Sequence, residues 1–357
     1  MGAGVTIVST CRMGPGTFEA KFVPLSRVNL VERIIVVRKE RGPNIPKLDY
    51  YVLPKICKNP IVNAILTPFI IARQVRLTKA AFILAYHYVP HYYLAYFASK
   101  LSGIPYILGQ TGSDDQKLAL RPIKGLLLRT AIKGAMYLNV PGSGSARFWN
   151  SLGYRNINIL HSTIDTDHFT PSYGEKEFDF IYIGRLEDYK GVHKIITAMQ
   201  DVVRKHPTAK LAIVGYGSQE EDLKKMVQQL DLTRSISFHG FQADTREWLW
   251  KAKIFVMASD TEGLPCALME AMSCGLICIS SEVGNVGDIL IDGKTGYCYH
   301  AEKNDILTNQ MLDALSRVNE SSGMQQAARE IIVREHSYQK SIALWSKIIM
   351  DRVLSNG

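Results

Sequence analysis

The 357-residue sequence has no apolar run long enough to cross a bilayer, because residues 61–72, its longest apolar stretch, are interrupted by Asn63, Thr67 and Pro68. A spanning helix needs roughly 20 apolar residues. The N-terminal residues have no basic segment before an apolar run and no small-residue cleavage site, so we expect no secretory signal. The six cysteines form no CxxC pair and show no zinc-ligand spacing, which argues against disulfides and a structural zinc. We therefore expect a cytoplasmic protein.

Acidic residues are scarce in the first half of the chain. Residues 1–172 contain 21 basic and eight acidic side chains, a net charge of +13, whereas residues 173–357 carry a net charge of −4. This asymmetry indicates a polyanionic partner for the first half, either nucleic acid or an anionic membrane surface. The sequence has no zinc finger and no RNP-type aromatic motif, so we expect no nucleic-acid partner. We predict that the partner is a membrane surface.

Basic side chains also follow two apolar stretches of this half. Arg73, Arg76 and Lys79 recur every three positions beyond residues 61–72, and Arg129 follows three leucines. Such mixed surfaces suit anionic lipid, although solvated faces of ordinary core helices explain each segment about equally well when it is taken alone. The net charge of the whole half favours the membrane.

Strand and helix patterns alternate along the chain in two series. The first has strand candidates and helical stretches at residues 6–9, from 17, 34–37, 82–85, 91–101, 106–108, 124–133 and 136–140. The second has them at residues 178–183, 192–205, 210–214, 219–230, 236–238, 245–250, 254–257, 266–273 and 277–280. This alternation predicts an α/β fold of two parallel sheets, each covered by helices on both faces. Two such domains in tandem predict a ligand cleft between the carboxyl ends of the two sheets.

The domain boundary is expected in the polar, turn-rich segment 161–176. We place it between residues 165 and 166, so that the first domain covers residues 1–165 and the second residues 166–334. No fixed-period repeat is visible, which excludes solenoids and propellers.

Two cations stand at the carboxyl end of the strand at 178–183. Gly184 and Arg185 follow this strand, and Lys190 comes just before the next helix. Charge-assisted hydrogen bonds and the helix dipole would together stabilise a phosphate or diphosphate bound at this position. Taken alone, two solvated surface cations are the more common explanation of so short a motif.

Two carboxylates form a second constellation. Glu262 stands in the loop after the strand at 254–257, before Gly263 and Leu264, and Glu270 lies about one turn into the following helix. Carboxylates suit the hydroxyl groups of sugars and ribose, since each oxygen can accept two hydrogen bonds. Glu262 could instead cap the helix, but a carboxylate inside a mostly apolar helix, as at position 270, requires a reason.

Two further motifs are weaker. Gly14 and Gly16 follow the first strand, where glycines let the backbone approach a phosphate, although an ordinary turn explains them as well. Asp165 and Asp167 form a DxD sequence, which is a metal-binding signature in some enzymes. We assign it to turn geometry, because it lies in the predicted linker and turn aspartates usually bond local backbone.

The segments GRLEDYKG, KLAIVGYGSQ and EGLPCALMEAMSCG, in this order, resemble the donor-binding half of family 4 retaining glycosyltransferases, which have the GT-B fold. The resemblance is dense over residues 157–300 and thinner before them. It implies that Arg185 and Lys190 bind a nucleotide diphosphate, that Glu270 binds its ribose, and that Glu262 lies near the donor sugar. It also implies a loop over the diphosphate at Gly14–Gly16, no divalent metal or other cofactor, and a C-terminal helix, residues 335–357, that returns to the first domain.

The first domain departs from the family pattern. The histidine that often precedes the glycine of segment 110–114 is replaced by Thr111, so the family's catalytic histidine has no clear counterpart. His87 and His91 follow a strand end and are candidates, with Thr111, for contact with the acceptor or for catalysis. A structural role for both histidines is equally consistent with the sequence.

The resemblance therefore predicts a retaining, metal-independent hexosyl or N-acetylhexosaminyl transferase of polysaccharide biosynthesis. Its donor would be a nucleotide diphosphate sugar, expected to be UDP-linked, and its acceptor a saccharide or lipid-linked molecule at the inner membrane face. Arg185, Lys190 and Glu262 would be its catalytic residues. Two alternatives stay open, namely a sugar-nucleotide epimerase of the same fold and a non-catalytic sugar-nucleotide-binding scaffold.

Overall fold

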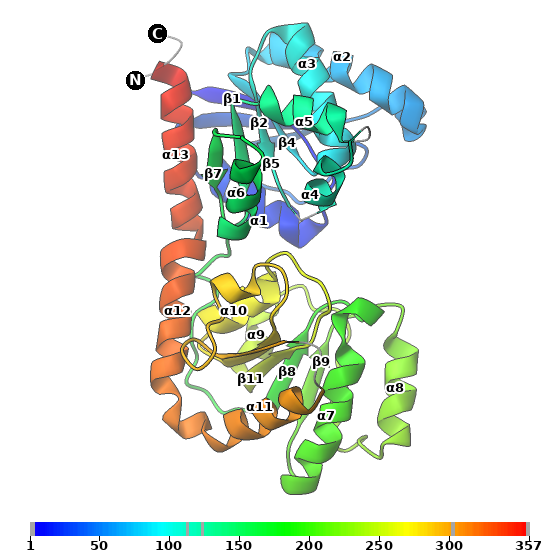
Figure 1. The fold of residues 1–357 in the computed structure, drawn as a ribbon, viewed down its shortest axis with the longest axis vertical. Coiled ribbons are helices and arrows are strands. Elements are labelled where there is room, and N and C mark those ends of the chain that lie inside the picture. Colours follow the sequence, from blue (N-terminus) through cyan, green and yellow to red (C-terminus); the bar gives the residue numbers. More distant parts are fainter. Residues whose placement is uncertain (1–3, 112–113, 123–124, 301–303, 355–357) are drawn as a thin grey trace. The chain divides into compact units, whose positions relative to one another are not determined.

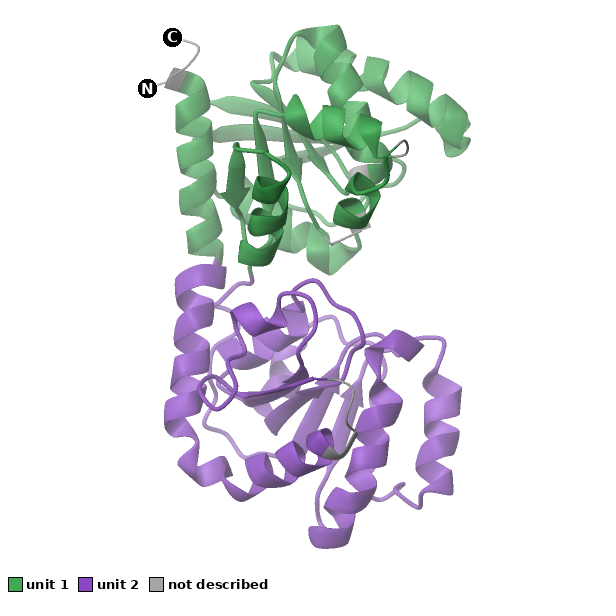
Figure 2. Ribbon diagram, viewed as in Figure 1, with its two compact units in different colours: residues 1–163, 338–357 green, residues 164–337 purple. Residues whose placement is uncertain are grey.

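The computed structural model describes residues 4–111, 114–122, 125–300 and 304–354. The chain divides into two compact units (Figure 2): unit 1 contains residues 1–163 and 338–357, and unit 2 contains residues 164–337. The divisions therefore fall at 163/164 and 337/338, where the sequence placed them at 165/166 and 334/335. The predicted segment 335–357 is split by the second division, since its first residues end a helix of unit 2.

Unit 1 is built on a seven-stranded parallel sheet with the order β3-β2-β1-β4-β5-β6-β7. Its strands are β1 (Val5–Thr10), β2 (Val31–Arg38), β3 (Leu48–Val52), β4 (Phe82–Tyr86), β5 (Tyr106–Gly109), β6 (Tyr137–Val140) and β7 (Ile157–Ile159). Its helices (Figure 1) are α1 (Pro15–Ser26), α2 (Pro60–Thr78), α3 (Tyr93–Ser102), α4 (Asp114–Ala119), α5 (Leu126–Lys133), α6 (Ser143–Ser151) and α13 (Tyr338–Leu354).

Helices cover both faces of this sheet because successive side chains of a strand point to opposite faces. Val8 and Ile83 pack in one core with residues of α2, α3, α5 and α6. Their neighbours Ile7 and Leu84 pack in another core with α1 and α13, which buries Trp345. Burial on both faces explains why the strands read as nearly continuous apolar runs.

Unit 2 contains a six-stranded parallel sheet with the order β10-β9-β8-β11-β12-β13. Its strands are β8 (Phe178–Ile183), β9 (Leu211–Val214), β10 (Ile236–Phe238), β11 (Ala252–Met257), β12 (Ile277–Ser281) and β13 (Tyr297–Tyr299). Its helices are α7 (Val192–Lys205), α8 (Glu220–Gln229), α9 (Arg246–Trp250), α10 (Cys266–Ser273), α11 (Asn304–Ser316) and α12 (Ser322–His336).

The same alternation builds two cores in unit 2. Phe180 packs with α7, α8 and α11, whereas the next residue, Ile181, packs with α9, α10 and α12. In each unit the first three strands are added in one direction and the later strands in the other, so the order reverses between β1 and β4 and between β8 and β11. The predicted α/β fold of two doubly wound domains is thus confirmed.

Several details differ from the sequence prediction. The first helix begins at Pro15 rather than at residue 17, and α3 begins at Tyr93 because a separate turn, Tyr88–Tyr92, precedes it. The strands β3, β7 and β13, which lie at sheet edges, were not predicted. Lys124, the predicted start of α5, lies outside the described residues, as do Gly112 and Ser113. No helix in the described part of the chain is both long and apolar enough to span a bilayer.

Candidate functional site

The predicted donor residues of unit 2 lie around the carboxyl ends of β8 and β11. Gly184 and Arg185 directly follow β8, Glu262 follows β11, and these two strands are neighbours in the sheet. The strand order reverses between β8 and β11, so the connections that follow these two strands run to opposite sides of the sheet. The two loops diverge and leave room for a ligand between them. The fold thus brings these three predicted residues to the topological switch point of the sheet.

The backbone of Arg185 is fixed by its own strand, since the Tyr182 hydroxyl donates a hydrogen bond of 2.8 Å to the Arg185 carbonyl oxygen. The Arg185 guanidinium contacts the hydroxyl of Tyr189 and lies 5.6 Å from the centre of its ring. The ammonium of Lys190 lies 5.5 Å from the same ring. Tyr189, which the sequence analysis did not single out, therefore stands between the two predicted phosphate-binding cations.

Lys190 ends a short turn at Asp188–Lys190, and Gly191 links that turn to α7. Gly191 has φ of +66°, and a β-carbon at this position would lie 2.0 Å from the carbonyl oxygen of Ala258. Only glycine fits both the left-handed backbone and this close approach. The contact ties the loop after β8 to the loop after β11.

Lys190 donates a hydrogen bond of 2.6 Å to Oε1 of Glu262, and the two side chains are only 17% and 10% exposed. The same oxygen accepts a hydrogen bond of 2.8 Å from Ser259. Next along the loop, the Gly263 carbonyl oxygen accepts from the amide of Asn285 at 2.8 Å, and Leu264 is buried in the core. The carboxylate of Glu262 thus lies on a loop that is held by hydrogen bonds to residues on either side of it.

Glu270 lies in α10, and its Oε2 accepts a hydrogen bond of 2.9 Å from the hydroxyl of Thr245. Burial raises the pKa of Glu270 from its ordinary value near 4.5 to about 7, with a further increase from Asp244. The bond from Thr245 opposes this increase. Near neutral pH the carboxyl group is therefore present in both its protonated and its ionised form.

The structure brings Lys190 and Glu262 into direct contact and links Arg185 to them through Tyr189. Glu270 is held separately, by Thr245, which precedes a different helix. Sequence reasoning missed Tyr189, Ser259 and Thr245. Tyr189 lies within the motif GRLEDYKG and Ser259 lies three residues before Glu262, so both could have been found from the sequence. Thr245 is 25 residues from Glu270 and carries no local signal.

In unit 1, Gly14 and Gly16 follow β1, at the corresponding switch point of the other sheet. A β-carbon at either position would meet nothing within 4 Å. Internal packing therefore does not require glycine at these positions, and the loop offers an open backbone surface.

A cavity of about 620 Å³ lies at this switch point. Its lining comes from the residues that follow β1, β2 and β4, and includes Thr10, Arg12, Gly14, Arg38, Lys39, His87 and His91. Three of these residues are basic and Glu40, which also lines the cavity, is acidic, so positive charge prevails and the cavity favours an anionic or strongly hydrogen-bonding ligand.

The two candidate histidines have different environments. His91 is buried, and its Nδ1 shares a hydrogen bond of 2.8 Å with the Thr10 hydroxyl. Burial, helped by His87 and nearby cations, lowers the pKa of His91 to about 3, so its imidazole is neutral at physiological pH. His87 has φ of +73° and its ring lies 6.4 Å from that of His91. Thr111 lies after β5 and does not line this cavity.

The DxD sequence forms a turn. Oδ1 of Asp165 accepts hydrogen bonds of 3.2 Å from the backbone amides of Asp167 and His168. This is the local backbone bonding expected of a turn aspartate. The described residues contain no cluster of three or more histidine, cysteine or acidic side chains that could hold a metal ion.

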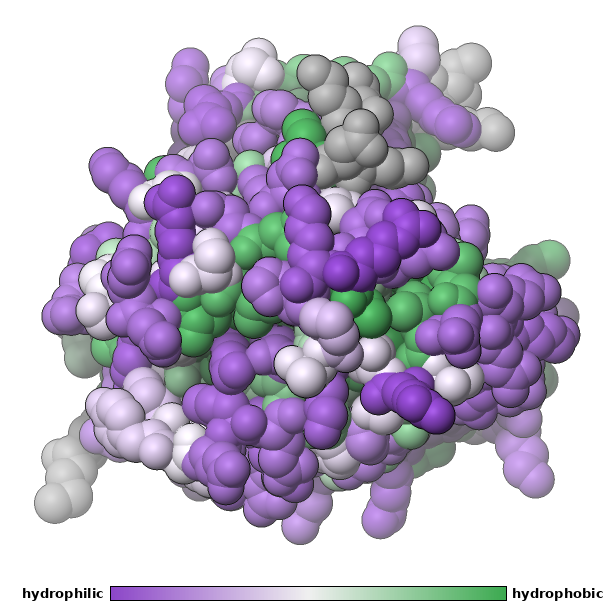
Figure 3. Space-filling view, turned by 90° about the horizontal axis from the view of Figure 1, so that it is seen from below, coloured by the Kyte–Doolittle hydropathy of each residue, from purple (hydrophilic) through white to green (hydrophobic). Residues whose placement is uncertain are grey.

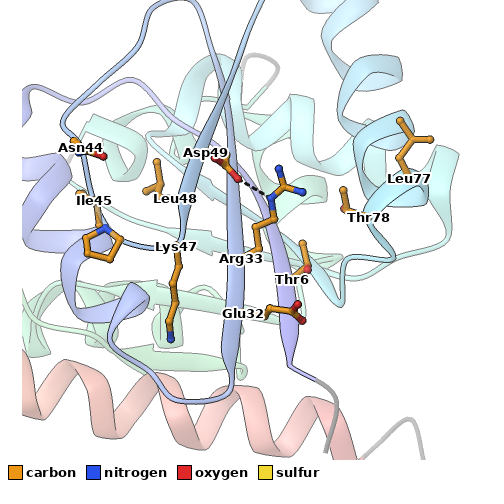
Figure 4. A pocket seen from close by; sticks show the side chains of 11 residues that line it. Thr6, Glu32, Arg33, Asn44, Ile45, Lys47, Leu48, Asp49, Leu77 and Thr78 are labelled. Atoms are coloured by element: carbon orange, nitrogen blue, oxygen red, sulfur yellow. Dashed lines mark hydrogen bonds and ion pairs between the residues drawn. The ribbon is translucent and has the colours of Figure 1, made fainter.

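A second cavity of unit 1, of about 590 Å³, is lined by residues at the opposite end of the sheet (Figure 4). Thr6, Glu32 and Leu48 stand at the amino-terminal ends of their strands. The Arg33 and Asp49 side chains on its wall form an ion pair of 2.6 Å. Because ligands of doubly wound sheets bind at the carboxyl ends of the strands, this cavity is not the candidate site.

Residues 163–331 match the family model described as Glycosyl transferases group 1. Among characterised relatives, N-acetyl-alpha-D-glucosaminyl L-malate synthase of Bacillus anthracis is 25% identical over 284 residues, which are 75% of this chain and 74% of that protein. The matched family region contains the whole β8/β11 site described above.

Solved structures resemble the full fold. A glycosyltransferase of Rickettsia africae superposes with a TM-score of 0.79 at 13% identity and covers 98% of this chain and 99% of its own. Alr3699/HepE of Anabaena, solved in complex with UDP, superposes with a TM-score of 0.77 at 15% identity and covers 98% of this chain and 100% of its own. Further structures of HepE hold UDP with glucose, or UDP-glucose.

Proposed function

We propose that the chain, a glycosyltransferase of group 1 with the GT-B fold, transfers a sugar with retention of configuration from a UDP-linked donor to a saccharide or lipid-linked acceptor at a membrane. The observation that carries the donor half of this proposal is the arrangement of Arg185, Lys190 and Glu262 at the switch point of the unit 2 sheet. It combines two cations with a sugar-compatible carboxylate.

Two observations support UDP as the donor nucleotide. HepE, which shares the fold, has been solved with UDP and with UDP-glucose. Glu270 offers a partly ionised carboxyl group near neutral pH, which suits the two hydroxyl groups of a ribose. In this proposal Glu270 binds the ribose and Glu262 lies near the donor sugar.

The chemistry is departure of the nucleoside diphosphate from the anomeric carbon. Negative charge grows on the leaving diphosphate, and Arg185 and Lys190 would stabilise it, since both are preorganised by Tyr189 before the ligand binds. The acceptor oxygen would form its bond to the anomeric carbon on the face that the diphosphate leaves, and the leaving diphosphate itself would take the proton of the acceptor hydroxyl. No side chain of the site is proposed as a covalent nucleophile.

The acceptor is assigned to unit 1, with its switch-point cavity and the candidates His87 and His91. The neutral imidazole of His91 would act there as a hydrogen-bonding group rather than as a store of protons. The net charge of +13 over residues 1–172 supports an acceptor at an anionic membrane, and we place the protein at the inner membrane face.

We further propose that transfer needs no divalent metal and no other cofactor. Asp165 is occupied by backbone bonds within its turn, which leaves the DxD sequence a structural role. Activity should therefore persist in EDTA. Strict dependence on manganese would instead restore Asp165 and Asp167 as a metal site.

A panel of nucleotide sugars tests the proposal directly. The expected result is release of UDP that depends on an added acceptor and is lost in Lys190→Ala. Lys194→Ala is the matched control, because Lys194 forms an ion pair of 2.5 Å with Asp260 close by but outside the proposed contacts. Release of an epimerised sugar, or binding of the nucleotide sugar with no turnover for any acceptor, would contradict the proposal and favour an epimerase or a non-catalytic binding protein.

A further inference from the structure

Helix α2 leaves one apolar face uncovered. Ile61, Ile65 and Phe69 are 70%, 57% and 57% exposed, and their spacing of four residues places them on one side of the helix. Leu66 beside them is also exposed, as is Ile56 in the turn that precedes the helix. These side chains form the outward face of α2.

The adjoining side of the same helix is buried in the core. Thr67, Pro68, Ile71, Ala72 and Val75 are buried, and α2 packs along α3 at the edge of unit 1 (Figure 1). A helix with so wide an apolar surface is typical of a buried position, yet only part of the apolar surface of α2 is covered by the described residues. The outward face therefore exposes apolar area that folding of this chain does not use.

The segment of the chain that contains this face carries positive charge only. Residues 50–113 contain six lysines and arginines and no aspartate or glutamate. Lys55 and Lys58 precede the outward face, and Arg73 and Arg76 follow it on α2. Within the described parts of the chain these four side chains enter no ion pair, although Arg76 donates a hydrogen bond to the carbonyl oxygen of Leu101 on α3.

The apolar surface continues next to this bond, since Leu101 and Phe97 of α3 are also exposed. Exposed apolar side chains of unit 2 are fewer and more scattered, for example Tyr173 and Phe241. The face of the molecule in Figure 3 is mainly hydrophilic, with apolar surface only in patches between polar side chains. The longest apolar stripe with basic flanks thus lies on α2, and a shorter one lies on α5, where the exposed Leu126 and Leu127 precede Arg129.

We propose that the outward face of α2 inserts into an anionic lipid bilayer, with Ile61, Ile65 and Phe69 among the acyl chains and the flanking lysines and arginines at the headgroups. Lipid is favoured over a protein partner because a long acid-free segment matches a uniformly anionic surface, and because lysines at the rim of an apolar stripe are typical of interfacial helices. The inference deepens the membrane partner of the proposed function by assigning the segment that binds.

Vesicle cosedimentation tests the inference with wild type, Ile65→Ser/Phe69→Ser, and the control Tyr173→Ser/Phe241→Ser, whose side chains are 100% and 67% exposed. Vesicles of phosphatidylcholine with phosphatidylglycerol are compared with phosphatidylcholine alone. Wild type and control should bind the anionic vesicles, less at high salt, and the α2 variant should lose at least about tenfold in affinity. Retention of wild-type affinity by the α2 variant would overturn the inference.

A second measurement reports insertion itself. In Phe69→Trp, brominated acyl chains should quench emission beyond the quenching seen in wild type, whereas Phe241→Trp should add no quenching. Absence of extra quenching in Phe69→Trp would overturn the inference even if cosedimentation is positive. So would self-association that Ile65→Ser/Phe69→Ser abolishes with no vesicle binding, because the face would then be a protein interface.

Donor binding is measured in the same variants, so that this inference and the proposed function fail separately. Thermal shift with UDP should be equal in wild type and in Ile65→Ser/Phe69→Ser, since α2 belongs to unit 1 and the donor residues to unit 2. Vesicle binding without any UDP shift in wild type would contradict the donor proposal alone. A UDP shift without vesicle binding would contradict the α2 inference alone.

Discussion

The ammonium nitrogen of Lys190 lies 2.6 Å from a carboxylate oxygen of Glu262, although 72 residues separate them in the chain. One follows β8 and the other follows β11, so the contact exists only because these strands are neighbours. Both side chains are mostly buried, and each therefore depends on the other for compensation of its charge. The cation proposed for the diphosphate and the carboxylate proposed for the sugar act as one unit.

This pairing predicts non-additive losses of stability. Lys190→Ala and Glu262→Ala should each lower the free energy of unfolding by about 1–3 kcal/mol, because each leaves a mostly buried partner unpaired. The double variant should lose clearly less than the sum. Urea unfolding of the four proteins measures the coupling. The exposed pair Lys194 and Asp260 is the control cycle, with expected coupling below about 1 kcal/mol; equal coupling in both cycles would contradict the prediction.

Arg185 and Tyr189 make a kinetic prediction. Arg185→Ala should lower turnover about a hundredfold or more, since a preorganised donor contributes on the order of 3 kcal/mol to the transition state. Tyr189→Phe keeps the ring under the guanidinium but removes the hydroxyl contact, so its loss should stay within about tenfold. Steady-state kinetics with a fixed acceptor measures both. A loss in Tyr189→Phe as large as in Arg185→Ala would show that the hydroxyl itself is needed.

The fold was predictable because its strands and helices follow strong local patterns. The bounds of β8, α7 and α10 are those that the sequence predicts. The elements that were missed have weaker local signals: β7 and β13 are three-residue strands at the edges of their sheets, and α2 contains Pro68, which reads as a break although it is buried within the helix.

The site was predictable only in part, for a different reason. Arg185, Lys190 and Glu262 stand at strand ends, and parallel strands bring their carboxyl ends to one edge. Which side chains then bond to one another depends on rotamers and loop paths that no local pattern encodes. The bond from Thr245 to Glu270 and the contacts of Tyr189 are of this kind.

Glu270 predicts a specific dependence of stability on pH. Its pKa is raised in the folded protein to about 7, so folding favours the protonated form. The stabilisation is complete below pH of about 4.5 and is lost as the pH rises through about 7. Glu270→Gln should lack this loss, and at pH 8 it should be more stable than wild type by on the order of 2 kcal/mol. Urea unfolding at pH 5 and pH 8 measures it; parallel profiles of the two proteins would contradict the raised pKa.

The same group predicts how UDP affinity depends on pH. If the carboxylate accepts bonds from ribose hydroxyls, the bound nucleotide favours the ionised form and lowers the pKa of Glu270, so affinity should rise as the pH increases through about 7. The phosphates of UDP also titrate, but they do so equally with Glu270→Gln, which serves as the reference. Calorimetry at pH 6 and pH 8 gives the difference. An identical change of affinity in both proteins would remove Glu270 from the ribose site.

We expect Gly191→Ala to lower the stability of the protein by more than the strain of a left-handed backbone alone would. Gly191→Ala introduces a β-carbon 2.0 Å from the Ala258 carbonyl oxygen in a backbone with φ of +66°, so the loops after β8 and β11 must separate. Gly240→Ala is the matched control, because its φ is +64° but nothing lies within 4 Å. The control should cost about 1 kcal/mol of stability, whereas Gly191→Ala should cost at least about 2 kcal/mol. Gly191→Ala should also weaken UDP binding, since Lys190 then moves relative to Glu262. Equal stability and equal UDP affinity in the two variants would show that the contact between the loops does not hold the site together.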